Sequence, residues 1–255
     1  MPHAPEVLIL AALVVAFAYT AFGLVGFGST VIALPLLTYF FALKFAVPLL
    51  MLLDLSAFLI FGTRVRKRIQ YAEIGWLVPF ILAGMAAGLF LLIEVAEQKL
   101  IALLGAFLLL YACYSLVRER FGRGAPALLS RAWGVPVGLA GGVFSALFGT
   151  GGVLFAAYNA GRIRDKDALR ATNAAMIMLS SLVRVVLFAA AGLLTQDGLL
   201  ATALVLLPAM LGGAWLGSRL HAAVPAAAVV KAVYALLVIA GLLLLARSLP
   251  QLFTL

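Results

Sequence analysis

The first 43 residues of the chain contain no lysine or arginine and are apolar almost throughout, yet the stretch GLVGFGSTVIALP interrupts them. A single helix over residues 5–43 would be about 58 Å long at about 1.5 Å per residue. The hydrocarbon core of a bilayer is only about 30 Å thick. The segment is therefore too long for one straight span. We expect it to fold back at Gly26 and Gly28, either as two short helices or as a re-entrant hairpin.

The composition places the whole chain in a membrane. Of the 255 residues, 66% are hydrophobic and 11% are charged, and the mean hydropathy is +1.21, whereas a soluble core of this size would need more polar surface. Only helices and closed barrels span lipid, and long apolar runs without two-residue alternation favour helices. We expect an all-α polytopic membrane protein. Its apolar segments predict a fold-back at 5–43, spans at 45–63, 74–93 and 100–117, a second fold-back at 133–160, and spans at 168–194, 199–220 and 226–247.

The net charge of +9 resides in short loop clusters rather than in one stripe. This pattern favours anchoring against anionic lipid over binding of nucleic acid. If residues 133–160 enter and leave on the same side, nearly all loop lysines and arginines fall on one face, as the positive-inside rule requires. We therefore expect a second break, at 149–152, to fold the chain back. The basic loops 64–68, 118–131 and 162–170 are then cytoplasmic.

The two halves of the chain carry the same motifs in the same order. The glycines of the first break correspond to Gly149 and Gly151, and the spacing of PFILAGMAAG at 79–88 recurs in PAMLGGAWLG at 208–217. Each half is a fold-back followed by three spans, an odd number of crossings. Residues 1–124 and 125–255 would then be two inverted-topology repeats, the architecture expected of a secondary transporter. Duplication for packing alone is the alternative.

The two breaks predict a site for a small anionic substrate. Interrupting a helix leaves backbone N–H groups free, which is costly in lipid unless a partner satisfies them. Glycine also lets an oxyanion approach a helix N-terminus closely. The predicted substrate-binding residues at the breaks are Gly26, Gly28, Ser29, Thr30, Thr150, Gly151 and Gly152. The alternative is that these glycines only let helices cross tightly, as we expect of Gly84, Gly88, Gly213 and Gly217.

Few polar residues lie at membrane depth. Asp54 is near the middle of its span, where insertion costs about 2.5–3.5 kcal/mol, so it must face the interior. It is our candidate for carrying a coupling proton, although pairing with Arg184 or bonding a free backbone end is an alternative. Asn173, Ser180 and Arg184 are spaced to share one helix face. We expect them to line the anion path; ordinary hydrogen bonds between helices, or a snorkelling Arg184, are the alternatives.

On these residues the chain resembles the TauE/SafE family of sulfite and organosulfonate exporters. The resemblance covers about residues 7–247 and rests on the breaks GFGSTVIALP and FGTGGVLF, the basic loop RVRKR and the paired proline–glycine spans. It implies a multi-pass carrier of the bacterial inner (plasma) membrane that moves small sulfur-containing or carboxylate anions, coupled to ion or proton gradients. Ser29, Thr30 and Tyr158 depart from the family pattern, which leaves the identity of the anion open.

The sequence thus favours a secondary active transporter that exports sulfite, an organosulfonate or a related anion by alternating access. A passive anion channel on the same scaffold is the alternative. An intramembrane enzyme is disfavoured, because His3 and His221 are the only histidines and no acidic pair has hydrolase or metal-ligand spacing. We expect no cofactor, no metal and no nucleic-acid partner. The lipid bilayer is the expected surrounding, and a homodimer is left open.

Overall fold

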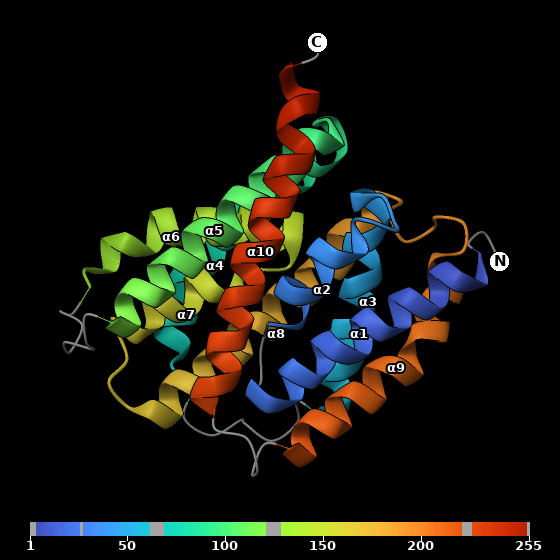
Figure 1. Ribbon diagram of the computed structural model, residues 1–255. Helices are drawn as coiled ribbons and strands as arrows, with labels where there is room; N and C mark the ends of the chain where they lie inside the picture. Colours follow the sequence, from blue (N-terminus) through green and yellow to red (C-terminus); the bar gives the residue numbers. More distant parts are fainter. Residues whose placement is uncertain (1–3, 26–27, 62–68, 121–128, 221–225, 254–255) are drawn as a thin grey trace. The chain divides into compact units, whose positions relative to one another are not determined.

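The computed structural model describes residues 4–25, 28–61, 69–120, 129–220 and 226–253. Within these ranges the chain is helical, without a β-strand (Figure 1). The elements are α1 (Pro5–Val25), α2 (Ser29–Leu37), α3 (Leu43–Phe61), α4 (Tyr71–Glu94), α5 (Glu97–Arg120), the 3₁₀ turn η1 (Arg131–Trp133), α6 (Gly134–Phe148), α7 (Gly152–Ala160), α8 (Lys166–Ala190), α9 (Leu199–Leu220) and α10 (Ala226–Phe253). Among the described residues, six helices are long and apolar enough to cross a bilayer. The predicted all-α membrane fold is confirmed.

The chain divides into two compact units, and each unit takes helices from both halves of the sequence. The first unit comprises Met1–Leu53, Val95–Gly122 and Thr195–Leu255, and so holds α1, α2, α5, α9, α10 and the first part of α3. The second unit comprises Asp54–Glu94 and Arg123–Leu194, and so holds α4, η1, α6, α7, α8 and the rest of α3.

In the first unit, α1 packs closely against α9 through small residues. A Cβ atom on Gly213 would collide with the carbonyl oxygen of Ala16, and one on Gly217 would collide with that of Thr20. In the other direction, a Cβ on Gly23 of α1 would collide with the backbone of α9. The two backbones therefore approach so closely that only glycine fits at these positions. Van der Waals packing of this kind is the main attraction between helices in lipid.

In the second unit, α4 packs against α6 in the same way. A Cβ on Gly84 would collide with the carbonyl oxygen of Leu139, and one on Gly88 would lie 2.7 Å from that of Val143. On α6, Gly142 meets the backbone of α4 at Ile81. The prediction that these glycines let helices cross tightly is confirmed for both proline–glycine spans. The core of this unit consists of the buried side chains Leu77, Ile81, Met85, Ala146, Phe155, Tyr158 and Met176.

The helix α8 ends earlier than the apolar pattern alone indicates. Gly192 has φ 71°, a left-handed conformation that glycine adopts without a Cβ clash. Its N–H donates to the carbonyl of Ala189 at 3.1 Å, and the N–H of Leu193 donates to that of Phe188 at 2.9 Å. This pair of bonds is a Schellman motif, which satisfies the last carbonyls of the helix.

Candidate functional site

The second break is a buried turn between α6 and α7. Gly149 has φ 70° and donates its N–H to the carbonyl of Ser145 at 2.9 Å, which ends α6 in a left-handed glycine cap. A Cβ on Gly151 would collide with the carbonyl oxygen of Gly141, and a Cβ on Gly141 would in turn collide with the ring of Phe155. The half-helix α7 therefore runs back along α6. The chain thus reverses direction at this turn, and its return to the same face of the membrane stays a prediction.

A polar stripe on α8 faces this fold-back. Asn173 accepts a hydrogen bond from Asn159 Nδ2 of α7 at 2.7 Å. Two helical turns further along α8, the hydroxyl of Ser180 lies 3.2 Å from the hydroxyl of Ser145 in α6. Arg184 then donates from Nη1 to the backbone carbonyl of Ser145 at 3.0 Å. The three residues do share one helix face, and all three contact α6 or α7.

Arg184 is buried rather than extended toward the membrane surface. It is 3% exposed, and its Nη2 lies 3.9 Å from Oδ2 of Asp54, which is 7% exposed. At this distance the two groups form an ion pair rather than a short hydrogen bond. The pairing of Asp54 with Arg184, one of the alternatives that the sequence leaves open, is therefore present. It neutralises two charges that would each be costly inside a membrane.

Thr150 places an unused hydroxyl at the start of α7. The residue is 2% exposed, and its Oγ1 has no hydrogen-bond partner among the described residues. It directly precedes Gly151, the N-cap of α7, where the first N–H groups of a helix point outward. A buried hydroxyl without a partner is unusual in proteins, because desolvating it is uncompensated. Its position beside a helix N-terminus fits a ligand that accepts hydrogen bonds.

The structure therefore brings together one part of the predicted site within the second unit. This part consists of Asp54, Thr150, Gly151, Gly152, Ser180 and Arg184, joined through Ser145. We call these residues, with Ser145, the α7 cradle. Asn173 lies on the same face of α8 but bonds Asn159, near the opposite end of α7.

The first break belongs to the other unit. There α2 begins at Ser29, its N-cap Gly28 has φ 94°, and Ser29 and Thr30 are buried in the first turn. Gly28 has no side chain that could cap α2, and its left-handed backbone conformation directs the chain into the helix. Gly26 lies outside the described residues. The loop 64–68 also lies outside them.

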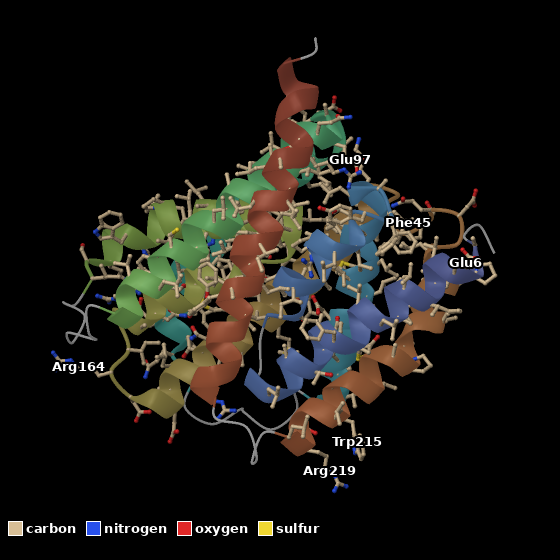
Figure 2. All side chains as sticks on the ribbon, in the orientation of Figure 1. Glu6, Phe45, Glu97, Arg164, Trp215 and Arg219 are labelled. Carbon is tan, nitrogen blue, oxygen red and sulfur yellow. The ribbon has the colours of Figure 1, made fainter. Side chains whose placement is uncertain are left out.

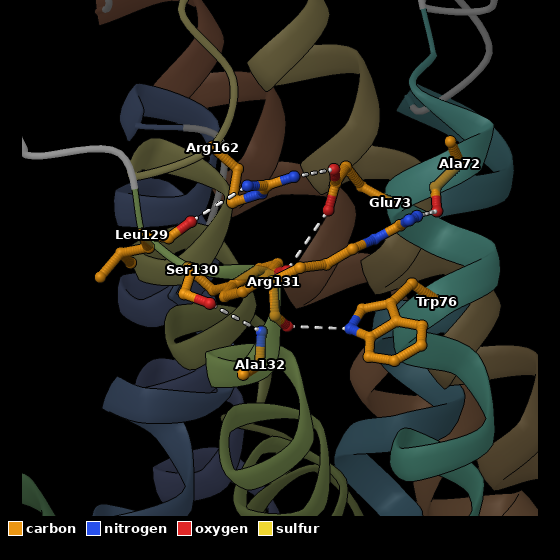
Figure 3. Close-up of polar contacts among 9 residues, drawn as sticks. Ala72, Glu73, Trp76, Leu129, Ser130, Arg131, Ala132 and Arg162 are labelled. Carbon is orange, nitrogen blue, oxygen red and sulfur yellow. Dashed lines mark hydrogen bonds and ion pairs between the residues drawn. The ribbon is translucent and has the colours of Figure 1, made fainter.

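A second polar cluster was not predicted from the sequence (Figure 3). Glu73, in the first turn of α4, accepts from Arg162 Nη2 at 2.7 Å and from the hydroxyl of Tyr158 at 3.3 Å. Nearby, Arg131 stacks over the ring of Trp76 at 5.2 Å and donates to the carbonyl of Ala72, while Trp76 Nε1 donates to the carbonyl of Arg131. The hydrogen bond to Glu73 raises the pKa of Arg162.

This cluster ties the C-terminal end of α7 to α4. Arg162 follows α7 directly and also donates to the carbonyl of Leu129 at 3.0 Å, so it joins three segments of the unit. In the sequence, Glu73 stands out only as an acidic residue at the start of a span. The sequence does not identify Arg162 as its partner, because the two residues are far apart in the chain and meet only after folding. Among the described residues, no group of three or more histidine, cysteine, aspartate or glutamate side chains could hold a metal ion.

Comparisons with known proteins relate the chain to membrane transporters. A family model described as "Sulfite exporter TauE/SafE" matches residues 10–244. A curated relative, the "Probable inner membrane transporter protein TsaS" of Comamonas testosteroni, is 27% identical over 195 residues, which are 76% of this chain and 80% of the relative. No solved structure matches the chain.

Proposed function

The chain belongs to the TauE/SafE family of sulfite exporters, and from this premise we propose that it exports a small sulfur-containing or carboxylate anion by alternating access, with the α7 cradle as part of the binding site. It is a multi-pass transporter of the bacterial inner membrane. The observation that carries the proposal is the buried guanidinium of Arg184 bonded to Ser145, which lies against Gly151 at the start of α7. The neighbouring Thr150 hydroxyl has no partner among the described residues.

The chemistry of the cradle suits an oxyanion. A sulfite, sulfonate or carboxylate group has several acceptor oxygens, and the cradle offers the donors that such a group needs. These are the Thr150 hydroxyl, the N–H groups at the start of α7 and the guanidinium of Arg184. A helix N-terminus adds a partial positive charge that favours the anion. Donors of this kind recognise the oxyanion and not the rest of the molecule, so several related anions fit.

Asp54 balances the charge of the cradle when no substrate is bound. Its carboxylate neutralises Arg184 when no anion is bound, so the arginine is not left as a lone charge in the membrane. An arriving anion would compete for the same guanidinium and leave Asp54 without its counter-charge. Proton uptake by Asp54 would then restore neutrality, which is the coupling we propose for this residue.

The packing of the helices supports alternating access between inverted repeats. Within the two units, α1 packs on α9 and α4 packs on α6. In each case the first helix of one half of the chain packs on the fourth helix of the other half. Two repeats that exchange equivalent helices would produce this pattern. Inverted repeats with broken helices are the common scaffold of carriers that alternate between two openings.

The direct test is anion binding to the purified protein. The unfolding midpoint would be recorded in detergent against sulfite, sulfate, thiosulfate, small sulfonates and small carboxylates at matched ionic strength. A ligand of the folded state raises stability by about 2.7 kcal/mol at 100 times its Kd. The test variant combines Asp54→Asn with Arg184→Gln, because removing Arg184 alone would leave a buried carboxylate unpaired. The control is Arg219→Ala, an exposed arginine over Trp215 at the end of α9 (Figure 2).

We expect one class of sulfur oxyanion or carboxylate to raise the midpoint of the native protein and of the Arg219→Ala control, but not that of the double variant. If the anion still raises the midpoint of the double variant, the α7 cradle is not part of the binding site. Flux into proteoliposomes separates the two mechanisms. Saturable uptake supports a transporter, whereas unsaturated conductance without a driving gradient would establish a passive anion channel.

A further inference from the structure

A polar cavity lies in the first unit, away from both breaks in the sequence. It has a volume of about 240 Å³ and is lined by Glu97, Gln98, Ile101, Arg247 and Ser248. Glu97 is the first residue of the apolar span of α5, which runs to Val117, and Ser248 is the last residue of the apolar stretch of α10. The cavity therefore opens where the apolar span of α5 begins and the apolar stretch of α10 ends. This is the level at which lipid head groups lie.

Arg247 forms one wall of this cavity. Its Nη1 donates to the carbonyl of Thr38 at 3.1 Å, and its guanidinium lies 5.1 Å from the ring centre of Tyr39. These two contacts hold the group in place but use only one of its five N–H donors. Within the described part of the chain it has no further partner. The remaining donors are available to a phosphate, which guanidinium binds well.

Glu97, at the start of α5, also lines this cavity (Figure 2). Its Oε1 accepts the N–H of Leu43 at 2.7 Å, while Oε2 has no partner among the described residues. Although Glu97 and Arg247 line one cavity, no ion pair joins them in the described chain. Because these opposite charges do not pair with each other, each can bind an oppositely charged group of the same ligand.

We propose that this cavity binds the head group of a phospholipid that carries a primary ammonium and a phosphate, the ammonium on Glu97 and the phosphate on Arg247. The volume supports a head group rather than a larger ligand, because pockets for drug-sized molecules measure about 300–1,000 Å³. A choline head group has no N–H to donate to the carboxylate. A glycerol head group has no cation and would bring its phosphate near an acidic side chain.

The test compares three lipids with identical acyl chains, phosphatidylethanolamine, phosphatidylcholine and phosphatidylglycerol. Each is titrated into the detergent-purified protein, and the unfolding midpoint gives its apparent Kd. The decisive variant is Glu97→Gln, which keeps an oxygen for the N–H of Leu43 but removes the charge. The matched control is Lys99→Gln, which removes an exposed charge in the same turn that does not line the cavity. O-phosphoethanolamine serves as the soluble head group.

We expect phosphatidylethanolamine to bind about tenfold more tightly than the other two lipids, the order that one charge-assisted hydrogen bond produces. Glu97→Gln should abolish this preference and Lys99→Gln should keep it. If Glu97→Gln does not fold, Arg247→Gln takes its place and should weaken all three lipids alike. Equal binding of the three lipids by the native protein, or a preference that survives in Glu97→Gln, would overturn the proposal. So would O-phosphoethanolamine acting as strongly as the whole lipid, since the site would then bind a free solute.

Discussion

Two neighbouring glycines in α9 allow the α1–α9 contact to be tested by the same substitution at adjacent positions. A Cβ on Gly213 would collide with the carbonyl oxygen of Ala16 and would lie 3.0 Å from both the carbonyl carbon and the Cα of that residue. A Cβ on Gly212 would meet no atom of the described residues within 4 Å. Gly213→Ala should therefore force α1 and α9 apart, whereas Gly212→Ala should not.

The size of the effect follows from the contact distances. Carbon atoms pack at about 3.5–4.0 Å, so a separation of roughly 0.5–1 Å is needed to accommodate the new methyl group. A shift of this size forfeits about a quarter to a half of the dispersion energy of the atoms involved. Forcing one methyl group into a packed interface costs about 1–3 kcal/mol. Gly212→Ala removes backbone freedom from the unfolded chain and should be neutral or stabilising by about 0.5–1 kcal/mol.

Titration with SDS in mixed micelles, followed by circular dichroism, gives the free energy of unfolding for both variants. The expected result is a difference of at least about 1 kcal/mol between the two alanine variants, with Gly213→Ala the less stable. Equal stabilities, or a lower stability for Gly212→Ala, would refute the close approach of α1 and α9. Because the residues are adjacent on one helix, general effects on insertion or helix propensity apply to both.

Three further predictions concern the second unit. Gly149→Ala should lower stability by about 1–2 kcal/mol, because a non-glycine residue is strained in the left-handed region. The control is Gly75→Ala, whose new methyl group would meet no atom of the described residues within 4 Å. Equal stabilities of the two variants in SDS titration would argue against the glycine cap. Glu73→Gln removes the charged partner of a hydrogen bond and should lower the free energy of unfolding by about 1.5–3 kcal/mol. The exposed Glu94→Gln is the control and should change it little. Equal stabilities of the two variants would show that the cluster around α4 is not stabilising. Asp54→Asn should abolish the dependence of anion flux on a proton gradient in proteoliposomes, and an unchanged dependence would exclude Asp54 from coupling.

The helices could be predicted because span length and apolarity decide them locally. The sequence also predicts that Gly84, Gly88, Gly213 and Gly217 are crossing points, since small residues at that spacing have few other uses in lipid. The sequence could not say which helix each would meet. Gly213 contacts Ala16, far away in the chain, and such a pairing depends on the arrangement of all the spans.

The candidate site was predictable in part for the same reason. The shared face of Asn173, Ser180 and Arg184 follows from helical periodicity, which is a local property. Their partners are not local, and Ser145, which bonds both Ser180 and Arg184, was not singled out at all. Periodicity also could not choose between a snorkelling Arg184 and a buried one. Burial depends on the carboxylate of Asp54 reaching it, and that carboxylate comes from α3.

The mixed origin of the two units has a consequence for how the protein is made. Helix α1 leaves the ribosome about 200 residues before α9, the helix whose glycines it packs against. At about 5–20 residues per second, this interval is roughly 10–40 s. During that time the small-residue face of α1 has no final partner and must be covered by lipid or by the insertion machinery. The first unit is complete only when α10 has been synthesised, so a nascent chain that stalls after the first half holds neither unit intact.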